Sequence, residues 1–74
     1  MKRLTELKPG ESGKVIAIFC SNEAGFVRRL AAFGIIVGKE IKVLRKYWFS
    51  PFHIQVGMTE IIIRKKDAHE IWVR

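Results

Sequence analysis

The sequence has one cysteine, two prolines and half as many acidic as basic side chains. The single cysteine, Cys20, excludes an internal disulfide, so the chain lacks the multi-cysteine framework on which small secreted domains depend. No stretch approaches the roughly 18 apolar residues of a membrane-spanning helix, and the first residues contain no apolar run suited to a signal peptide. The sequence therefore predicts a cytoplasmic protein with no transmembrane segment.

The length of 74 residues limits what the chain can build. A chain of this size buries only about 60% of the surface that its unfolded form exposes, so two separate cores are excluded. Apolar residues make up 49% of the chain and no internal repeat or linker is visible, which is typical of a globular domain. We expect one domain over residues 1–74, with no deep catalytic cleft.

The charge is strongly positive, with 14 Lys and Arg against 7 Asp and Glu and a formal net charge of +7. Such a balance predicts attraction to an anionic partner, which leaves nucleic acid, an acidic protein surface and lipid headgroups as candidates. The basic residues are spread along the sequence as pairs and triplets, so a solvated surface also explains them.

Apolar periodicity predicts a mainly β fold. Phe26, Leu30 and Phe33 recur at helical spacing before Gly34, which predicts a short, half-buried helix that ends in a left-handed glycine. We expect these three residues to form its buried stripe. Gly13 is expected to close the loop that begins at Pro9 and Gly10. Alternation and apolar runs predict strands over 15–19, 40–44, 53–56, 60–64 and 71–73, with one helical turn over 65–70. Ile54 and Val56 fall on one side of their strand, and a turn at Gly57 and Met58 is expected to lead to the strand over 60–64. We expect about five short strands curled into a small barrel, with one inserted helix.

The motifs do not indicate an enzyme. The segment GESGKV resembles a phosphate-binding loop, but that motif requires a glycine where Lys8 stands and a hydroxyl side chain where Val15 stands. The sequence shows no nucleophile, base and orienting residue at the spacings of known hydrolase motifs. We therefore predict a non-enzymatic protein without a cofactor.

Potential metal ligands are present but scattered. Asp67 and His69 lie two positions apart, which places them on different sides of a helical turn. Asp67 is better explained as a cap of that turn. The full set is Cys20, His53, Met58, Asp67, His69 and Glu70, and no spacing among them predicts a metal site.

An aromatic cluster lies between two of the expected strands. Tyr47, Trp48, Phe49 and Phe52 surround Pro51, and four large rings in six positions cannot all point inward from a loop or hairpin. We expect some of them to be exposed as a contact for a partner protein. Two alternatives remain, because the barrel edge can fold over these rings or the rings can bury a self-dimer contact.

The order of these segments resembles the ferrous iron transport protein A family, whose members carry the FeoA-like domain. The resemblance rests on LKPGESGKVIAI at 7–18, RRLAAFGIIVGKEIKV at 28–43 and IQVGMTEIIIRKKDAHEIWV at 54–73. It implies an SH3-like small β-barrel. In the pattern R-L-x-x-x-G-x-x-x-G, Leu30 would anchor the helix while Gly34 and Gly38 permit backbone turns.

The resemblance also implies a cytoplasmic accessory role in ferrous iron transport, beside a ferrous iron permease whose cytoplasmic part is a GTPase. We expect a binding module that contacts this partner through Arg28, Arg29, Tyr47, Trp48, Phe49 and Phe52, with contact to the membrane surface or a homodimer as further options. The alternative is a basic barrel that binds single-stranded nucleic acid by stacking bases on aromatic rings. No recognition helix or ribonucleoprotein motif accompanies the charge, which disfavours that alternative.

Overall fold

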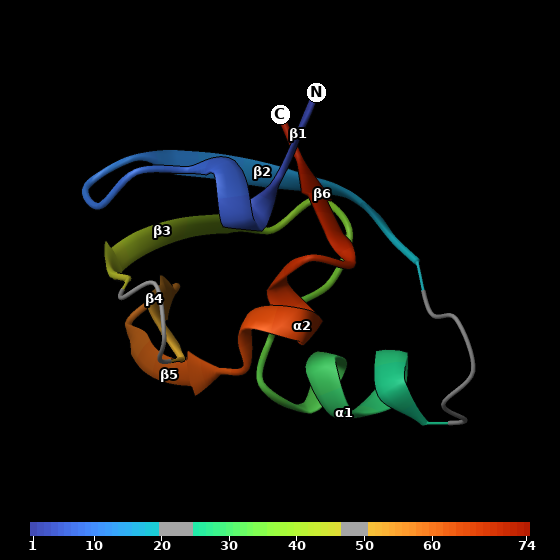
Figure 1. Ribbon diagram of the computed structural model, residues 1–74. Coiled ribbons are helices and arrows are strands. Elements are labelled where there is room, and N and C mark those ends of the chain that lie inside the picture. Colours follow the sequence, from blue (N-terminus) through green and yellow to red (C-terminus); the bar gives the residue numbers. More distant parts are fainter. Residues whose placement is uncertain (20–24, 47–50) are drawn as a thin grey trace.

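A computed structural model describes residues 1–19, 25–46 and 51–74 (Figure 1). The described residues form β1 (Lys2–Arg3), η1 (Leu4–Glu6), β2 (Ser12–Ile18), α1 (Phe26–Ala32), β3 (Glu40–Arg45), β4 (Phe52–Val56), β5 (Thr59–Ile63), α2 (Lys65–Ala68) and β6 (Ile71–Val73). The fold is mainly β, as predicted, with six strands in place of about five. None of the described helices has the length and apolar character needed to cross a membrane.

The six strands form one antiparallel sheet in the order β1-β6-β2-β3-β4-β5. The sheet is not closed into a complete barrel, so β1 and β5 lie at its two edges. Lys2 is paired with Val73, which places the amino and carboxyl ends of the chain together. In Figure 1 both ends lie at the top of the molecule, and α1 lies at the bottom.

The core forms where alternate strand residues turn inward. In β4, Phe52, Ile54 and Val56 are buried while the two residues between them are half-buried, as the alternating sequence predicts. The buried apolar side chains form one cluster: Leu4, Leu7, Val15, Phe26, Leu30, Ile35, Ile41, Val43, Phe52, Ile54, Val56, Ile61, Ile63, Ala68, Ile71 and Val73. Each of the two helices and each strand from β2 to β6 contributes to this cluster.

Helix α1 is anchored on the core by two of the three predicted residues. Phe26 and Leu30 are buried, but Phe33 is 49% exposed, so its assignment to the buried stripe was wrong. The helix ends at Ala32, Phe33 is its C-cap residue, and Gly34 follows with a φ of 88°. Because Phe33 lies at the helix end, it no longer follows helical periodicity, and the fully buried Ile35 packs into the core instead.

Gly13 has a different role from the one predicted. It lies inside β2, paired with Ile41, and does not close a loop. A Cβ atom at this position would lie 2.8 Å from the Cβ of Val73 and 3.4 Å from the Cδ1 of Leu7. The glycine is therefore required by the close approach of β6 to β2, and not by a turn.

Candidate partner-binding surface

The two arginines predicted to contact a partner lie on the exposed side of α1. Arg28 and Arg29 are both exposed, while Phe26 and Leu30 fix the opposite side of the helix in the core. The guanidinium carbon of Arg29 lies 5.8 Å from the centre of the Phe26 ring, a cation–π contact that orients this side chain along the helix. The structure thus presents two positive charges on a short, anchored helix.

Exposed apolar side chains follow these arginines in the segment that leads from α1 to β3. Phe33 and Ile36 are each 49% exposed and Val37 is 62% exposed. Together with Arg28 and Arg29 they are called the α1–β3 surface below. Sequence reasoning missed the apolar part because it assigned Phe33 to the core. The sequence does indicate this exposure, because Phe33 and residues 35–37 are large and apolar, and a turn around Gly34 cannot bury all of them.

The aromatic cluster is only partly described. Tyr47, Trp48 and Phe49 lie outside the described residues, so their predicted contact with a partner stays a prediction. Phe52 is 1% exposed and pairs with Ile63 across β4 and β5. Its assignment as a partner contact is therefore corrected, because a ring buried in the core has no surface to offer a partner.

Lys46, which precedes the aromatic cluster, is engaged within the fold. Its Nζ donates hydrogen bonds of 2.9 Å to the carbonyl oxygens of Thr5 and Leu7 and lies 5.6 Å from the centre of the Phe52 ring. Both carbonyl groups belong to the η1 turn or its end. The ammonium group therefore links the end of β3 to the amino-terminal segment, which the sequence alone did not indicate.

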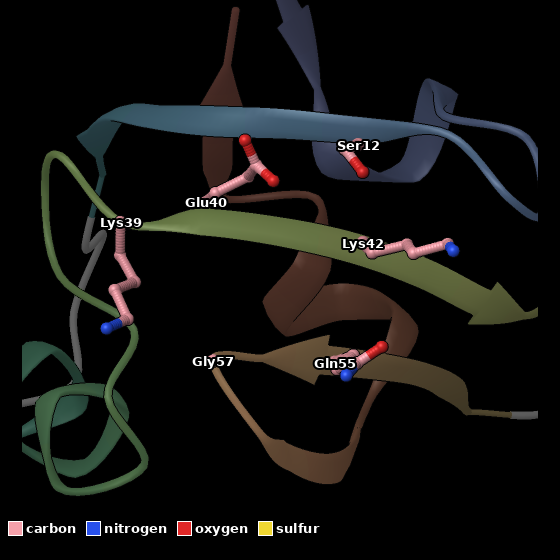
Figure 2. Close-up of a pocket in the computed structure, with 6 residues that line it drawn as sticks. All are labelled: Ser12, Lys39, Glu40, Lys42, Gln55 and Gly57. Atoms are coloured by element: carbon pink, nitrogen blue, oxygen red, sulfur yellow. The ribbon is translucent and has the colours of Figure 1, made fainter.

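A polar concavity of about 360 Å³ lies on the outer side of the sheet. It is lined by Ser12, Lys39, Glu40, Lys42, Gln55 and Gly57, and Figure 2 shows Ser12, Lys42 and Gln55 on three neighbouring strands. Strand pairing explains this arrangement, because Lys42 is paired with Ser12 on one side and with Gln55 on the other. The ammonium groups of Lys39 and Lys42 and the carboxylate of Glu40 suit the binding of a polar or acidic peptide segment.

Among residues 1–19, 25–46 and 51–74, no three His, Cys, Asp or Glu side chains gather as a metal site. The Asp67 carboxylate accepts hydrogen bonds from Nε of Arg64 at 3.0 Å and from a terminal guanidinium nitrogen of Arg64 at 3.3 Å. Asp67 thus pairs with the residue before α2, and no side-chain hydrogen bond caps that helix. Cys20, another potential ligand, lies outside the described residues.

The family model of the FeoA domain matches residues 2–74. The chain belongs to the FeoA family. Solved FeoA structures have the same fold: an iron uptake regulatory protein, FeoA, is 30% identical, with a TM-score of 0.85 and coverage of 97% of this chain and 92% of that one. The FeoA of Stenotrophomonas maltophilia, solved with zinc and described as an SH3 domain protein, is 28% identical, with a TM-score of 0.83 and coverage of 100% and 91%.

The same fold occurs in a larger protein of another kind. A manganese-dependent transcriptional repressor matches with a TM-score of 0.86 at 20% identity, over 97% of this FeoA chain and 40% of the repressor chain. At that identity the similarity shows the fold alone. No curated protein sequence matches the chain.

Proposed function

We propose that this FeoA protein is a non-enzymatic accessory protein of ferrous iron uptake that binds the cytoplasmic GTPase part of a ferrous iron permease. The observation that carries the proposal is the match of the FeoA family model over residues 2–74, because this family is associated with ferrous iron transport. The S. maltophilia relative is described as possibly acting as a bacterial ferrous iron transport activating factor, which supports the same role.

The α1–β3 surface is the contact that we assign to this partner. It combines the positive charge of Arg28 and Arg29 with the exposed apolar side chains of Phe33, Ile36 and Val37. Protein interfaces commonly have an apolar centre with charged residues at the rim, and arginine is enriched in them. In this proposal iron is the cargo of the permease and is not bound by this chain.

The proposal is tested by titrating the protein with the soluble GTPase part of the permease, in its GDP and GTP-analogue states, while amide resonances are recorded. Resonance shifts should concentrate in residues 26–38. Arg28→Glu should weaken binding by about tenfold, equivalent to about 1.4 kcal/mol. Arg74→Glu changes the same charge at the opposite end of the molecule and should bind normally (Figure 1). A wild-type protein that binds in neither nucleotide state, with or without membranes, would contradict the proposal.

The aromatic residues 47–49 are tested in the same titration. If Trp48 is an exposed anchor, Trp48→Ala should cost about 2 kcal/mol or more of binding free energy while leaving thermal unfolding within about 0.5 kcal/mol of wild type. Should Trp48→Ala instead unfold early, its ring belongs to the packing of the domain, and the interface is confined to the α1–β3 surface.

A further inference from the structure

Strand β5 is an open edge of the sheet. It pairs with β4 on one side and is the last strand in the sheet order (Figure 1). The two strands are joined by Gly57 and Met58, and Gly57 has a φ of 62°, as a two-residue hairpin with glycine at its first position requires. This short connection fixes which backbone groups of β5 face β4.

In a two-residue hairpin the residues on either side of the loop form a hydrogen-bonded pair, and such pairs then alternate along the ladder. Val56 and Thr59 are that pair here, so Ile61 and Ile63 also direct their backbone groups toward β4. The N–H and C=O groups of Glu60 and Ile62 therefore point away from the sheet. Among the described residues, no backbone hydrogen bond connects these groups to another segment.

The side chains of this edge do little to block an incoming strand. Ile62 is 60% exposed and Met58, in the turn, is 98% exposed. Natural proteins usually protect long open edges with lysine, proline, a bulge or a covering segment. The strand, with sequence TEIII, contains neither lysine nor proline, and the β4–β5 register is regular over all five pairs. The edge has the features of a strand-addition site.

Charge indicates which kind of strand would bind. Lys66 is exposed just after β5, and the whole chain carries a net charge of +7. Two cross-sheet rows end at this edge: Lys42 and Gln55 lead to Glu60, while Arg45 and His53 lead to Ile62. Glu60 places a negative charge in the amino-terminal half of β5, so the attraction for an acidic segment is confined to the carboxyl-terminal half, toward Lys66. A second copy would bring another +7 to the edge, whereas an acidic segment would be attracted to it.

We propose that β5 binds an extended acidic segment of a partner protein, which adds to the sheet as an antiparallel strand through the backbone groups of Glu60 and Ile62. The acidic residues would lie at the amino-terminal end of that segment, because an antiparallel strand begins beside the carboxyl end of β5, where Lys66 lies. This inference goes beyond the proposed function and does not rest on it, since the edge and the α1–β3 surface are different parts of the molecule.

The first experiment uses the wild-type protein. Amide hydrogen exchange is recorded with and without a short acetylated peptide that has an acidic amino-terminal half and a β-branched carboxyl-terminal half. In the free protein the amides of Glu60 and Ile62 should exchange faster than those of Ile61 and Ile63. Saturating peptide should slow the exchange at Glu60 and Ile62 by about tenfold or more. The same peptide with methylated amides on the side that faces β5 should give no protection.

Two variants separate the backbone from the side chain. Ile62→Pro removes the outward N–H without removing a hydrogen bond to β4, and should weaken peptide binding by about tenfold or more. Ile62→Thr keeps the N–H and removes apolar surface, so binding should weaken by about threefold or less. Thermal unfolding is measured for both variants, and the exchange experiment stands without them if Ile62→Pro fails to fold.

Any other result of the peptide experiments overturns the strand-addition proposal. Lack of protection at Glu60 and Ile62 means that no strand adds to this edge. Equal binding of a peptide with lysines in place of the acidic residues removes the argument from charge. Protection that rises with protein concentration in the absence of peptide identifies a second copy as the occupant. Binding of the GTPase part with normal affinity by Ile62→Pro would leave the proposed function intact, so the two proposals fail independently.

Discussion

Replacing Gly13 with alanine tests how closely β2 and β6 approach each other. The added Cβ would lie 2.8 Å from the Cβ and 2.9 Å from the Cγ2 of Val73, whereas carbon atoms in good contact are about 3.5–4.0 Å apart. One strand must therefore move away from the other by roughly 1 Å. Val73 is 1% exposed, and its branched side chain has few alternative rotamers, so the backbone has to absorb the shift.

Overpacking of this kind typically costs about 1–3 kcal/mol. Since a domain has about 5–15 kcal/mol of stability in all, Gly13→Ala should lower the urea midpoint and the melting temperature clearly. Ser12→Ala is the matched control, because it lies next to Gly13 in β2 with an exposed side chain and should stay within about 0.5 kcal/mol of wild type. A Gly13→Ala variant as stable as Ser12→Ala would refute the reasoning, because β6 would then tolerate a methyl group at no cost.

Three further predictions concern other positions. Leu30→Ala removes a side chain that is 2% exposed and should destabilise the domain by about 2–5 kcal/mol in urea unfolding, losing partner binding only through loss of the fold. Lys46→Met keeps the aliphatic stem but loses both hydrogen bonds to the carbonyl groups of Thr5 and Leu7. It should lower the free energy of unfolding by about 2 kcal/mol and speed amide exchange in residues 2–7. Unchanged exchange there would contradict the role given to the lysine. The hydrogen bond from the Lys8 N–H lowers the pKa of Glu11, with nearby lysine charges adding to the effect. Ionised Glu11 should therefore stabilise the folded domain above about pH 4.5, and this stabilisation should disappear as the pH falls through the lower pKa of the folded state. Glu11→Gln should flatten that acid-side decline in a series of melting curves, and an unchanged decline would contradict this role of the carboxylate.

Much of the fold could be predicted because most of the strands bury one face. The alternation in β4 distinguishes buried Ile54 and Val56 from the residues beside them, and the pairing of β4 with β5 follows from a two-residue turn at Gly57. Gly34 and Gly38 were predicted to permit backbone turns, and both have positive φ angles, of 88° and 95°. These features depend on local sequence, which is why a single sequence revealed them.

The features that escaped prediction depend on segments far apart in the chain. Gly13 is required by Val73, which lies 60 positions later, and nothing near Gly13 in the sequence indicates that contact. Lys46 reaches carbonyl groups 39 and 41 positions away. Phe33 shows the converse case, because a shift of one residue in the helix end changes a core position into an exposed one.

The pairing of Lys2 with Val73 has a practical consequence for any experiment on this protein. Because the two chain ends leave the domain side by side, an affinity tag or fluorescent fusion on either end occupies the same corner, opposite α1 (Figure 1). The ends are also close enough for a short linker to join them, so the chain is suited to circular permutation and to insertion as a unit into a surface loop of another protein. A permuted chain opened between Gly57 and Met58 would remove the turn between β4 and β5, so these two strands would have to pair from opposite ends of the new chain.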